Sequence, residues 1–220
     1  MKGSRNPEAA FLAIMTAGAT HEVRNVLAII KESAGLIEDM VYLFEKKGKL
    51  DREKLHRAVD RIDTQVKRGA DLLTSLNRLS HTLDSDTTPL ELNEEVAQVG
   101  FLSQRFARKQ GHQVSVRSLD KGLPLTLNQL HLHMALFSAM DLLLETLTEG
   151  ATVEMRVVER GGVAAVEFQG TQGGESPPVG DFAEEGLAGV RTWVRAVGAE
   201  MQGLDDGFGL RILFPETTEA

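Results

Sequence analysis

The sequence contains no cysteine, and this absence removes two kinds of chemistry. Without thiols the chain forms neither disulfide bonds nor thiolate metal sites. Long apolar runs are missing as well: no stretch approaches the ~18 residues that a membrane-spanning helix needs. The first residues do not have the pattern of a signal peptide. We therefore expect a cytoplasmic chain without a membrane span.

Positive charge is in short supply. The 24 Lys and Arg residues stand against 32 Asp and Glu residues, which gives a formal net charge of −8. No basic stripe compensates this excess, so we expect no nucleic acid as a partner. The hydrophobic share of 42% and the charged share of 25% are ordinary for a globular protein. With 220 residues, the chain is long enough for one large domain or two modest ones.

Helical periodicity dominates residues 6–84. Asn6 before Pro7 is typical of a helix start, because an N-cap side chain is followed by a residue whose missing N–H costs nothing there. The pattern breaks at Gly48, which suits the end of a helix, and Asp51 suits the N-cap of the next one. Two long antiparallel helices are predicted.

Such a hairpin, assigned here to residues 1–86 with its second helix over 52–83, shares one narrow interface and leaves much apolar surface uncovered. Pairing of two hairpins into a four-helix bundle covers that surface. We therefore expect a homodimer. The alternative is that the hairpin packs on the C-terminal half of its own chain.

The C-terminal half, residues 87–220, has mixed periodicity and is predicted to form a second domain. Asn93 is the expected N-cap of its first helix, and Gly161-Gly162 marks a hairpin between two strands. We expect an α+β chain overall, with a two-layer α/β sandwich whose helices lie on one face of a mixed sheet. Helices are predicted for residues 94–110, 127–147 and 183–199, and strands for residues 113–119, 152–160, 163–170 and 207–215.

Residues 20–30, THEVRNVLAII, place reactive groups on a helix that otherwise reads as apolar. His21 and Asn25 are one turn apart on one face, with Glu22 beside them. A neutral imidazole nitrogen is nucleophilic near pH 7, which makes histidine a good phosphoryl acceptor. A carboxylate beside it takes or steers a proton, and an amide orients phosphoryl oxygens or a water molecule.

The turn before His21 holds small residues that leave the imidazole accessible to a partner. Ala17, Gly18 and Arg24 are the candidate partner-binding residues. A close helix–helix contact is the alternative reason for Gly18, which costs about 1 kcal/mol relative to alanine within a helix. The five other histidines are interpreted as structural, and no metal site is expected. They are His56, His81, His112, His131 and His133.

HEVRNVLAII resembles the H-box of sensor histidine kinases, which reads H-E-hydrophobic-R/K-N/T-P-L. Val26 stands where that family usually has proline. The resemblance covers the hairpin and implies that His21 is the phosphoacceptor and Glu22 its acid/base partner. It also implies that Asn25 aligns the phosphoryl group or a water molecule.

The C-terminal half resembles the ATP-binding domain of the same family in the order of its elements, but most ATP-handling residues are missing. The helix that should carry asparagines for Mg²⁺ and phosphates offers only Asp141. Gln169 stands where an aspartate should meet adenine, and the lid is a short loop containing Pro177. Only Gly186 and Gly189 remain of the phosphate-side glycines. We therefore expect no bound cofactor and no metal in this chain.

An H-box hairpin joined to a degenerate ATP domain resembles the histidine phosphotransferases of phosphorelays. The resemblance implies response-regulator receiver domains as partners, with Mg²⁺ supplied by the receiver. His21 would accept a phosphoryl group from one receiver and donate it to another without ATP. Two alternatives stay open: an ATP-dependent sensor histidine kinase, and a non-catalytic dimeric adaptor that sequesters a response regulator.

Overall fold

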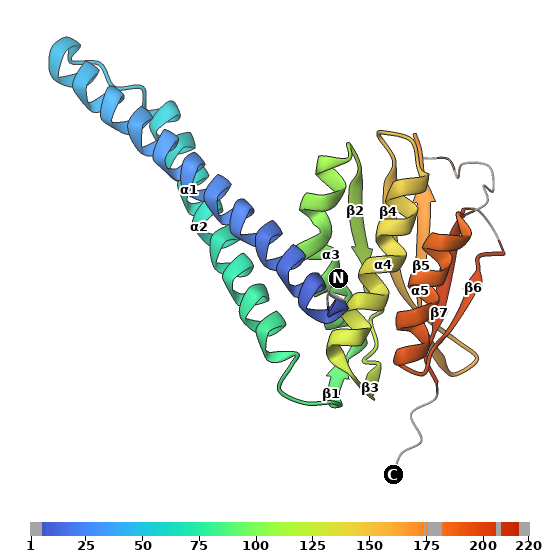
Figure 1. The fold of residues 1–220 in the computed structure, drawn as a ribbon. Helices are drawn as coiled ribbons and strands as arrows, with labels where there is room; N and C mark the ends of the chain where they lie inside the picture. Colours follow the sequence, from blue (N-terminus) through green and yellow to red (C-terminus); the bar gives the residue numbers. More distant parts are fainter. Residues whose placement is uncertain (1–5, 174, 176–181, 206–207, 216–220) are drawn as a thin grey trace, which may run out of the picture. The chain divides into compact units, whose positions relative to one another are not determined.

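The computed structural model describes residues 6–173, 175, 182–205 and 208–215. The chain forms two compact units, coloured along the sequence in Figure 1. One unit is Leu12–Ser80. The other combines the two ends of the chain, Met1–Phe11 and His81–Ala220.

The first unit is a helical hairpin. Helix α1 spans Pro7–Lys47 and helix α2 spans Arg52–His81, and the two run antiparallel and side by side in Figure 1. The predicted hairpin is thus confirmed, with α2 ending two residues before the expected position 83. The first residues of α1, up to Phe11, belong to the second unit.

The predicted helix ends follow local hydrogen bonding. The Oδ1 atom of Asn6 accepts the backbone N–H of Glu8 at 2.9 Å, and the Oδ1 atom of Asp51 accepts that of Lys54 at 3.0 Å. The bond from Lys54 is the main reason that the pKa of Asp51 lies below its usual value. Gly48 has a φ of +64°, the left-handed conformation that glycine adopts most easily after a helix.

Inside the hairpin, Gly69 lets the helices approach closely at Val26. Val26 and Leu72 are each 3% exposed, and a Cβ atom added to Gly69 would lie 3.3 Å from Cγ1 of Val26. An ion pair between Arg61 and Glu32, 3.0 Å apart, links the helices nearer to the turn. These contacts hold the two helices in one register.

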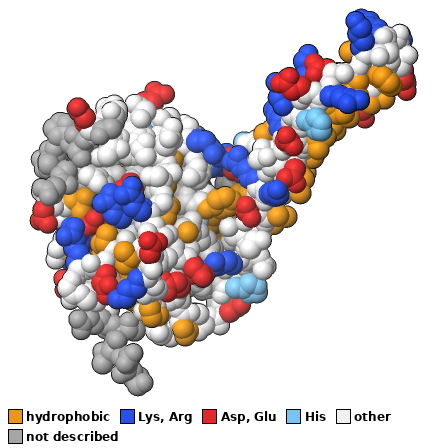
Figure 2. Space-filling view, turned by 180° about the vertical axis from the view of Figure 1, so that it is seen from behind, with side chains coloured by type: hydrophobic (Ala, Val, Ile, Leu, Met, Phe, Trp, Pro, Cys, Tyr) orange, Lys and Arg blue, Asp and Glu red, His pale blue; other side chains and the backbone are white. Residues whose placement is uncertain are grey.

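Much of the hairpin surface is apolar, and Figure 2 shows hydrophobic side chains along its length. The most exposed are Leu27 and Leu73, each 59% exposed. In α2 the exposed positions Val59, Val66 and Leu73 recur every seven residues, so they line one side of the helix. The other large exposed apolar residues of the hairpin are Ile14, Leu36, Val41, Tyr42, Leu43, Phe44 and Leu50.

The second unit is built on a five-stranded mixed sheet with the strand order β2-β4-β5-β7-β6. Strands β2 and β4 are parallel, and the other neighbours are antiparallel. Strands β1 and β3 form a separate antiparallel pair. The strands are β1 Thr88–Glu91, β2 Gln113–Arg117, β3 Pro124–Leu127, β4 Thr152–Arg160, β5 Val163–Thr171, β6 Glu200–Gly203 and β7 Gly209–Leu213.

Helices α3 (Leu92–Lys109), α4 (Gln129–Thr146) and α5 (Glu184–Ala196) cover one face of this sheet, as expected (Figure 1). The core between the two layers is closely packed: Leu132 and Phe168 are fully buried. The sequence therefore predicted the α+β class and the two-layer sandwich correctly.

The expected role of Asn93 is wrong. Helix α3 follows β1 directly, so Glu91 is the N-cap and its side chain accepts the backbone N–H of Asn93. The Asn93 side chain instead ties the following loop to the helix. Its Nδ2 atom donates to the carbonyl of Lys121 at 2.9 Å, and its Oδ1 atom accepts from the backbone N–H of Leu119 at 2.9 Å.

Three short strands were not predicted: β1, β3 and β6, each of four residues. In the sequence, DSDTTP (residues 84–89) indicates a turn-rich linker and residues 122–124 indicate a loop, because so short a strand carries little alternation. Helix α4 begins at Gln129 rather than at 127, because Leu127 ends β3 and Asn128 caps the helix.

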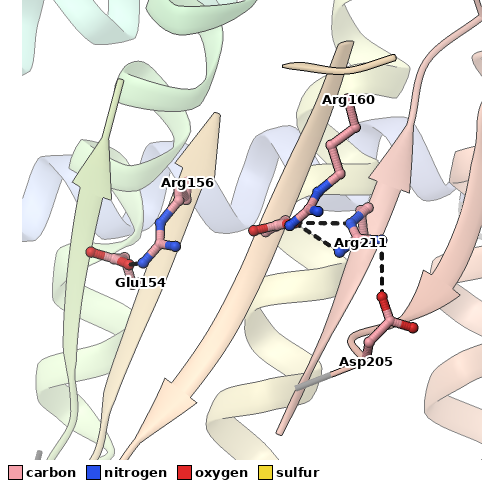
Figure 3. Close-up of polar contacts among 6 residues, drawn as sticks. Glu154, Arg156, Arg160, Asp205 and Arg211 are labelled. Carbon is pink, nitrogen blue, oxygen red and sulfur yellow. Dashed lines mark hydrogen bonds and ion pairs between the residues drawn. The ribbon is translucent and has the colours of Figure 1, made fainter. Parts of the chain in front are cut away.

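Ion pairs join neighbouring strands on the sheet face opposite the helices (Figure 3). Arg211 on β7 and Arg160 at the end of β4 both donate to Oε1 of Glu167 on β5, at 2.9 and 3.1 Å. Glu154 and Arg156 pair beside them on β4. Opposite charges on neighbouring strands stabilise such a face, so these ion pairs have a structural role.

Candidate functional site

The H-box residues lie in the first half of α1, inside the hairpin unit. His21 is exposed, and its Nδ1 atom is 3.3 Å from Nδ2 of Asn25 one turn later. The helical spacing therefore brings these two side chains together as the sequence indicated. An exposed imidazole on a regular helix is accessible to another protein.

Glu22 lies on the inner side of the helix and is 9% exposed. Its Oε1 atom accepts Nδ2 of Asn25 at 3.3 Å, and its Oε2 atom accepts Nη2 of Arg68 from α2 at 2.6 Å. The site thus forms a continuous sequence of contacts: Arg68, Glu22, Asn25, His21. A charged pair at this distance and burial fixes the position of the carboxylate more firmly than an exposed pair does.

The sequence did not reveal Arg68. It lies 46 residues from Glu22, so no spacing rule within one helix connects them. Only the register of α1 against α2 brings them together, and that register depends on packing such as Val26 against Gly69. The one available signal was the presence of an arginine on a helix predicted to run antiparallel to α1.

The candidate partner-binding residues differ in accessibility. Ala17 and Arg24 are exposed on α1, whereas Gly18 is buried. Because Gly18 is buried, a partner reaches Ala17 or Arg24 more easily than Gly18. The contact with a partner stays a prediction. Val26, at the position of the family's proline, continues the helix without interruption.

The second candidate region is the face of α4, which corresponds to the nucleotide site in the resemblance to the kinase ATP domain. Here Leu142 packs against the start of α5: a Cβ atom added to Gly186 would lie 2.5 Å from Cδ1 of Leu142. Gly186 therefore makes room for a leucine side chain. Leu142 is 5% exposed.

Asp141, the possible substitute for a metal-binding asparagine, is partly buried and hydrogen-bonded to the side chain of Gln110. Burial raises the pKa of this carboxyl, the nearby Glu145 raises it further, and a hydrogen bond with the side chain of Gln110 lowers it in part. A carboxyl that burial drives toward its neutral form, next to a second carboxyl, is a poor single ligand for Mg²⁺.

Gln169 lies on β5 next to Phe168, whose side chain is in the core. Because side chains alternate along a strand, Gln169 is on the sheet face away from the helices. Gly189 is exposed, with open space where a Cβ atom would be. The lid residue Pro177 lies outside the described residues.

The histidines of α4 have structural partners. His133 Nε2 is 2.5 Å from Oε2 of Glu95, and both side chains are almost fully buried. His131 Nε2 is 2.8 Å from Oε1 of Glu8, and its ring lies against Trp193. Among the described residues, no group of three or more histidine, aspartate and glutamate side chains is arranged to hold a metal ion.

Across the described parts of the chain, none of the helices combines the length and apolar character needed to cross a membrane.

No protein-family model matches the sequence, and no curated protein matches it. Solved structures do. The nucleotide-free catalytic domain of histidine kinase ThkA is 16% identical, has a TM-score of 0.50 and covers 61% of this chain and 100% of its own. This likeness shows a shared fold, so the predicted similarity to a histidine-kinase ATP domain is confirmed at the level of the fold.

Two longer structures are also similar. Histidine kinase AdeS from Acinetobacter baumannii is 14% identical, with a TM-score of 0.47, over 90% of this chain and 98% of that one. ThkA in its complex with the response regulator protein TrrA is 20% identical, with a TM-score of 0.49, over 97% of this chain and 64% of that one.

Proposed function

We propose that this protein is a histidine phosphotransferase of a phosphorelay. His21 accepts a phosphoryl group from the aspartate of one receiver domain and donates it to another, and ATP takes no part. The fold shared with the ThkA catalytic domain is the premise, and the exposed imidazole of His21 with Asn25 3.3 Å from its ring carries the proposal.

The proposed transfer requires from this chain only a nucleophile and the groups that orient it. The lone pair of a neutral ring nitrogen of His21 attacks phosphorus, an N–P bond forms, and the P–O bond to the aspartate breaks with its electrons leaving on the carboxylate. Asn25 orients the ring and the phosphoryl oxygens, and Glu22 is the proposed acid/base partner. The receiver brings the Mg²⁺ that offsets the charge of the phosphoryl group.

Three features support independence from ATP. Leu142 occupies the space above Gly186, where a polar group would be needed for phosphates. Asp141 is turned to Gln110 and resists ionisation. Gln169 is on the opposite face of the sheet from the helices. Each missing polar contact is worth on the order of 1–3 kcal/mol, so their combined loss removes most nucleotide affinity.

The same proposal includes a homodimer with a four-helix bundle. The apolar side chains exposed along α1 and α2, among them Leu27, Val66 and Leu73, are the supporting observation. A second hairpin buries them in the coiled-coil manner that the seven-residue recurrence in α2 favours. The receiver is proposed to dock near residues 17–25, with Ala17 and Arg24 at the contact and Gly18 behind them.

Calorimetric titration with ATP and Mg²⁺ tests the first half of the proposal. No binding up to millimolar ATP is expected, whereas micromolar binding would support the kinase alternative. The second half is tested with a receiver domain phosphorylated on its aspartate: label should move to His21. Receiver binding that survives His21→Ala, with no transfer to the unmodified protein, would identify the adaptor instead.

A further inference from the structure

We propose that Arg68 is a positioning residue that sets the tautomer of His21. It acts through Glu22 and Asn25, and it holds the resting imidazole with its proton on Nε2. This inference rests on the proposed function for its significance, but the geometry that carries it is independent of any phosphoryl transfer.

The first step is the ion pair between the helices. The guanidinium of Arg68 is always charged, and its Nη2 atom is 2.6 Å from Oε2 of Glu22. The side chain of Glu22 is 11% exposed and that of Arg68 37%, so water screens the pair only partly. Arg68 therefore holds the carboxylate of Glu22 turned inward.

The second step fixes the amide of Asn25. An ionised carboxylate only accepts hydrogen bonds. The Asn25 atom that lies 3.3 Å from Oε1 of Glu22 must therefore be the NH₂ nitrogen and not the carbonyl oxygen. The two ends of an amide are otherwise hard to tell apart, and here the charge of Glu22 decides between them.

The third step concerns the imidazole. The same NH₂ nitrogen of Asn25 lies 3.3 Å from Nδ1 of His21. It has two hydrogens, one for Glu22 and one for His21, so Nδ1 has to be the acceptor. A neutral imidazole carries one proton, which must then be on Nε2.

This arrangement makes the resting ring a poor nucleophile. The lone pair of Nδ1 is engaged by Asn25, and Nε2 has no lone pair in the ring plane until its proton leaves. If the Asn25 amide turns over, Nε2 releases its proton to water while Nδ1 takes up another and donates it in a hydrogen bond to the amide oxygen. The lone pair of Nε2 is then free to attack phosphorus. While Arg68 anchors Glu22, that turn brings the amide oxygen against the carboxylate, which disfavours it. A docked receiver that displaces Glu22 from Arg68 would release the ring.

The test is ¹⁵N NMR of the imidazole nitrogens in histidine-labelled protein, at a pH well above the ordinary imidazole pKa of about 6.5. Signals of His21 are assigned by their loss in His21→Gln. The variants are Arg68→Met, which removes the anchor, and Arg68→Lys, which keeps its charge. Arg61→Met is the matched control, because Arg61 and Glu32 form another ion pair between α1 and α2, at 3.0 Å.

The unmodified protein, Arg68→Lys and Arg61→Met should each show His21 as a single Nε2–H tautomer. Arg68→Met should show a shift toward a mixture of tautomers. Labelling of His21 by phosphoramidate, a small donor that needs no docking, should become faster in Arg68→Met and stay unchanged in Arg61→Met.

A mixture in the unmodified protein, or an Arg68→Met spectrum identical to it, would overturn the inference. Slower labelling of Arg68→Met would overturn the restraint on reactivity. The spectra are recorded without a phosphoryl donor, so a protein that shows the tautomer shift but accepts no phosphoryl group from receivers disproves only the proposed function.

Discussion

The two units of this chain treat their apolar residues in opposite ways. The sandwich buries Phe168 and Leu132 completely between sheet and helices, whereas the hairpin leaves Leu73 and Leu27 59% exposed. The apolar side of the hairpin is therefore the surface that a second hairpin covers in the proposed dimer. The residues proposed to take part in phosphoryl transfer also lie on the hairpin.

The same difference bears on the proposed independence from ATP. In the sandwich, a leucine fills the space above Gly186, and the one carboxyl that might replace a metal ligand, Asp141, is driven toward its neutral form. The leucine is part of the buried core, and the carboxyl is partly buried. In the hairpin, His21 stays exposed while Glu22 and Arg68 hold its neighbours in place.

The largest effect is expected at His21. His21→Gln should abolish phosphohistidine formation completely, because no other described residue is proposed to accept the group. The side chain is exposed, so the free energy of unfolding should change by less than about 0.5 kcal/mol. Receiver-dependent labelling measures phosphohistidine formation, and thermal unfolding measures stability. Residual label on the variant would show that another residue accepts the phosphoryl group.

A core substitution in the sandwich and an apolar substitution on the hairpin should affect stability in different ways. Phe168→Ala leaves a cavity in the sandwich and should lower its free energy of unfolding by about 3–5 kcal/mol. Leu73→Ala, in contrast, should weaken the proposed dimer, so the hairpin should unfold at a lower denaturant concentration than in the unmodified protein, with the largest difference at low protein concentration. Chemical denaturation at several protein concentrations distinguishes these cases. A Leu73→Ala protein that behaves like the unmodified one at every concentration argues against the bundle.

A smaller effect is expected from Asn25→Ala. During transfer the turned-over amide orients the ring, and loss of that hydrogen bond, worth on the order of 1–3 kcal/mol, should slow transfer between receiver and His21 by about tenfold to a hundredfold. The variant is also freed from the resting tautomer, but it lacks the group that holds the reactive one. Receiver affinity should stay the same, because the amide orients the reacting groups rather than forming the docking contact. Rapid-quench transfer rates and calorimetry of receiver binding provide the comparison; equal transfer rates would remove the role assigned to Asn25.

The smallest effect is expected at Asp141. Its pKa is raised by burial, so between the unfolded and the raised folded pKa the native state binds more protons than the unfolded one. Stability therefore falls as pH rises through that window, and the ionised carboxylate is destabilising at neutral pH. Asp141→Asn should add up to about 1 kcal/mol at pH 7 and nothing near pH 3. A loss of stability at pH 7 would show that the carboxylate is needed.

Long periodic elements could be predicted from the sequence, and features set by tertiary contact could not. The hairpin of α1 and α2 and the strands beside Gly161-Gly162 follow from spacing and turn residues. Strand β6 is four residues long and exists because it pairs with β7. In the site, His21 and Asn25 were within reach of a spacing rule, whereas Arg68 required the register of two helices.

Two parallel reactions test most directly whether the hairpin performs phosphoryl transfer while the sandwich does not use ATP. One reaction contains radiolabelled ATP and Mg²⁺, and the other contains a receiver domain labelled on its aspartate. We predict label on His21 only in the second reaction, and none in the His21→Gln control. Label from ATP alone would contradict the proposed function, because the sandwich would then be a working kinase domain.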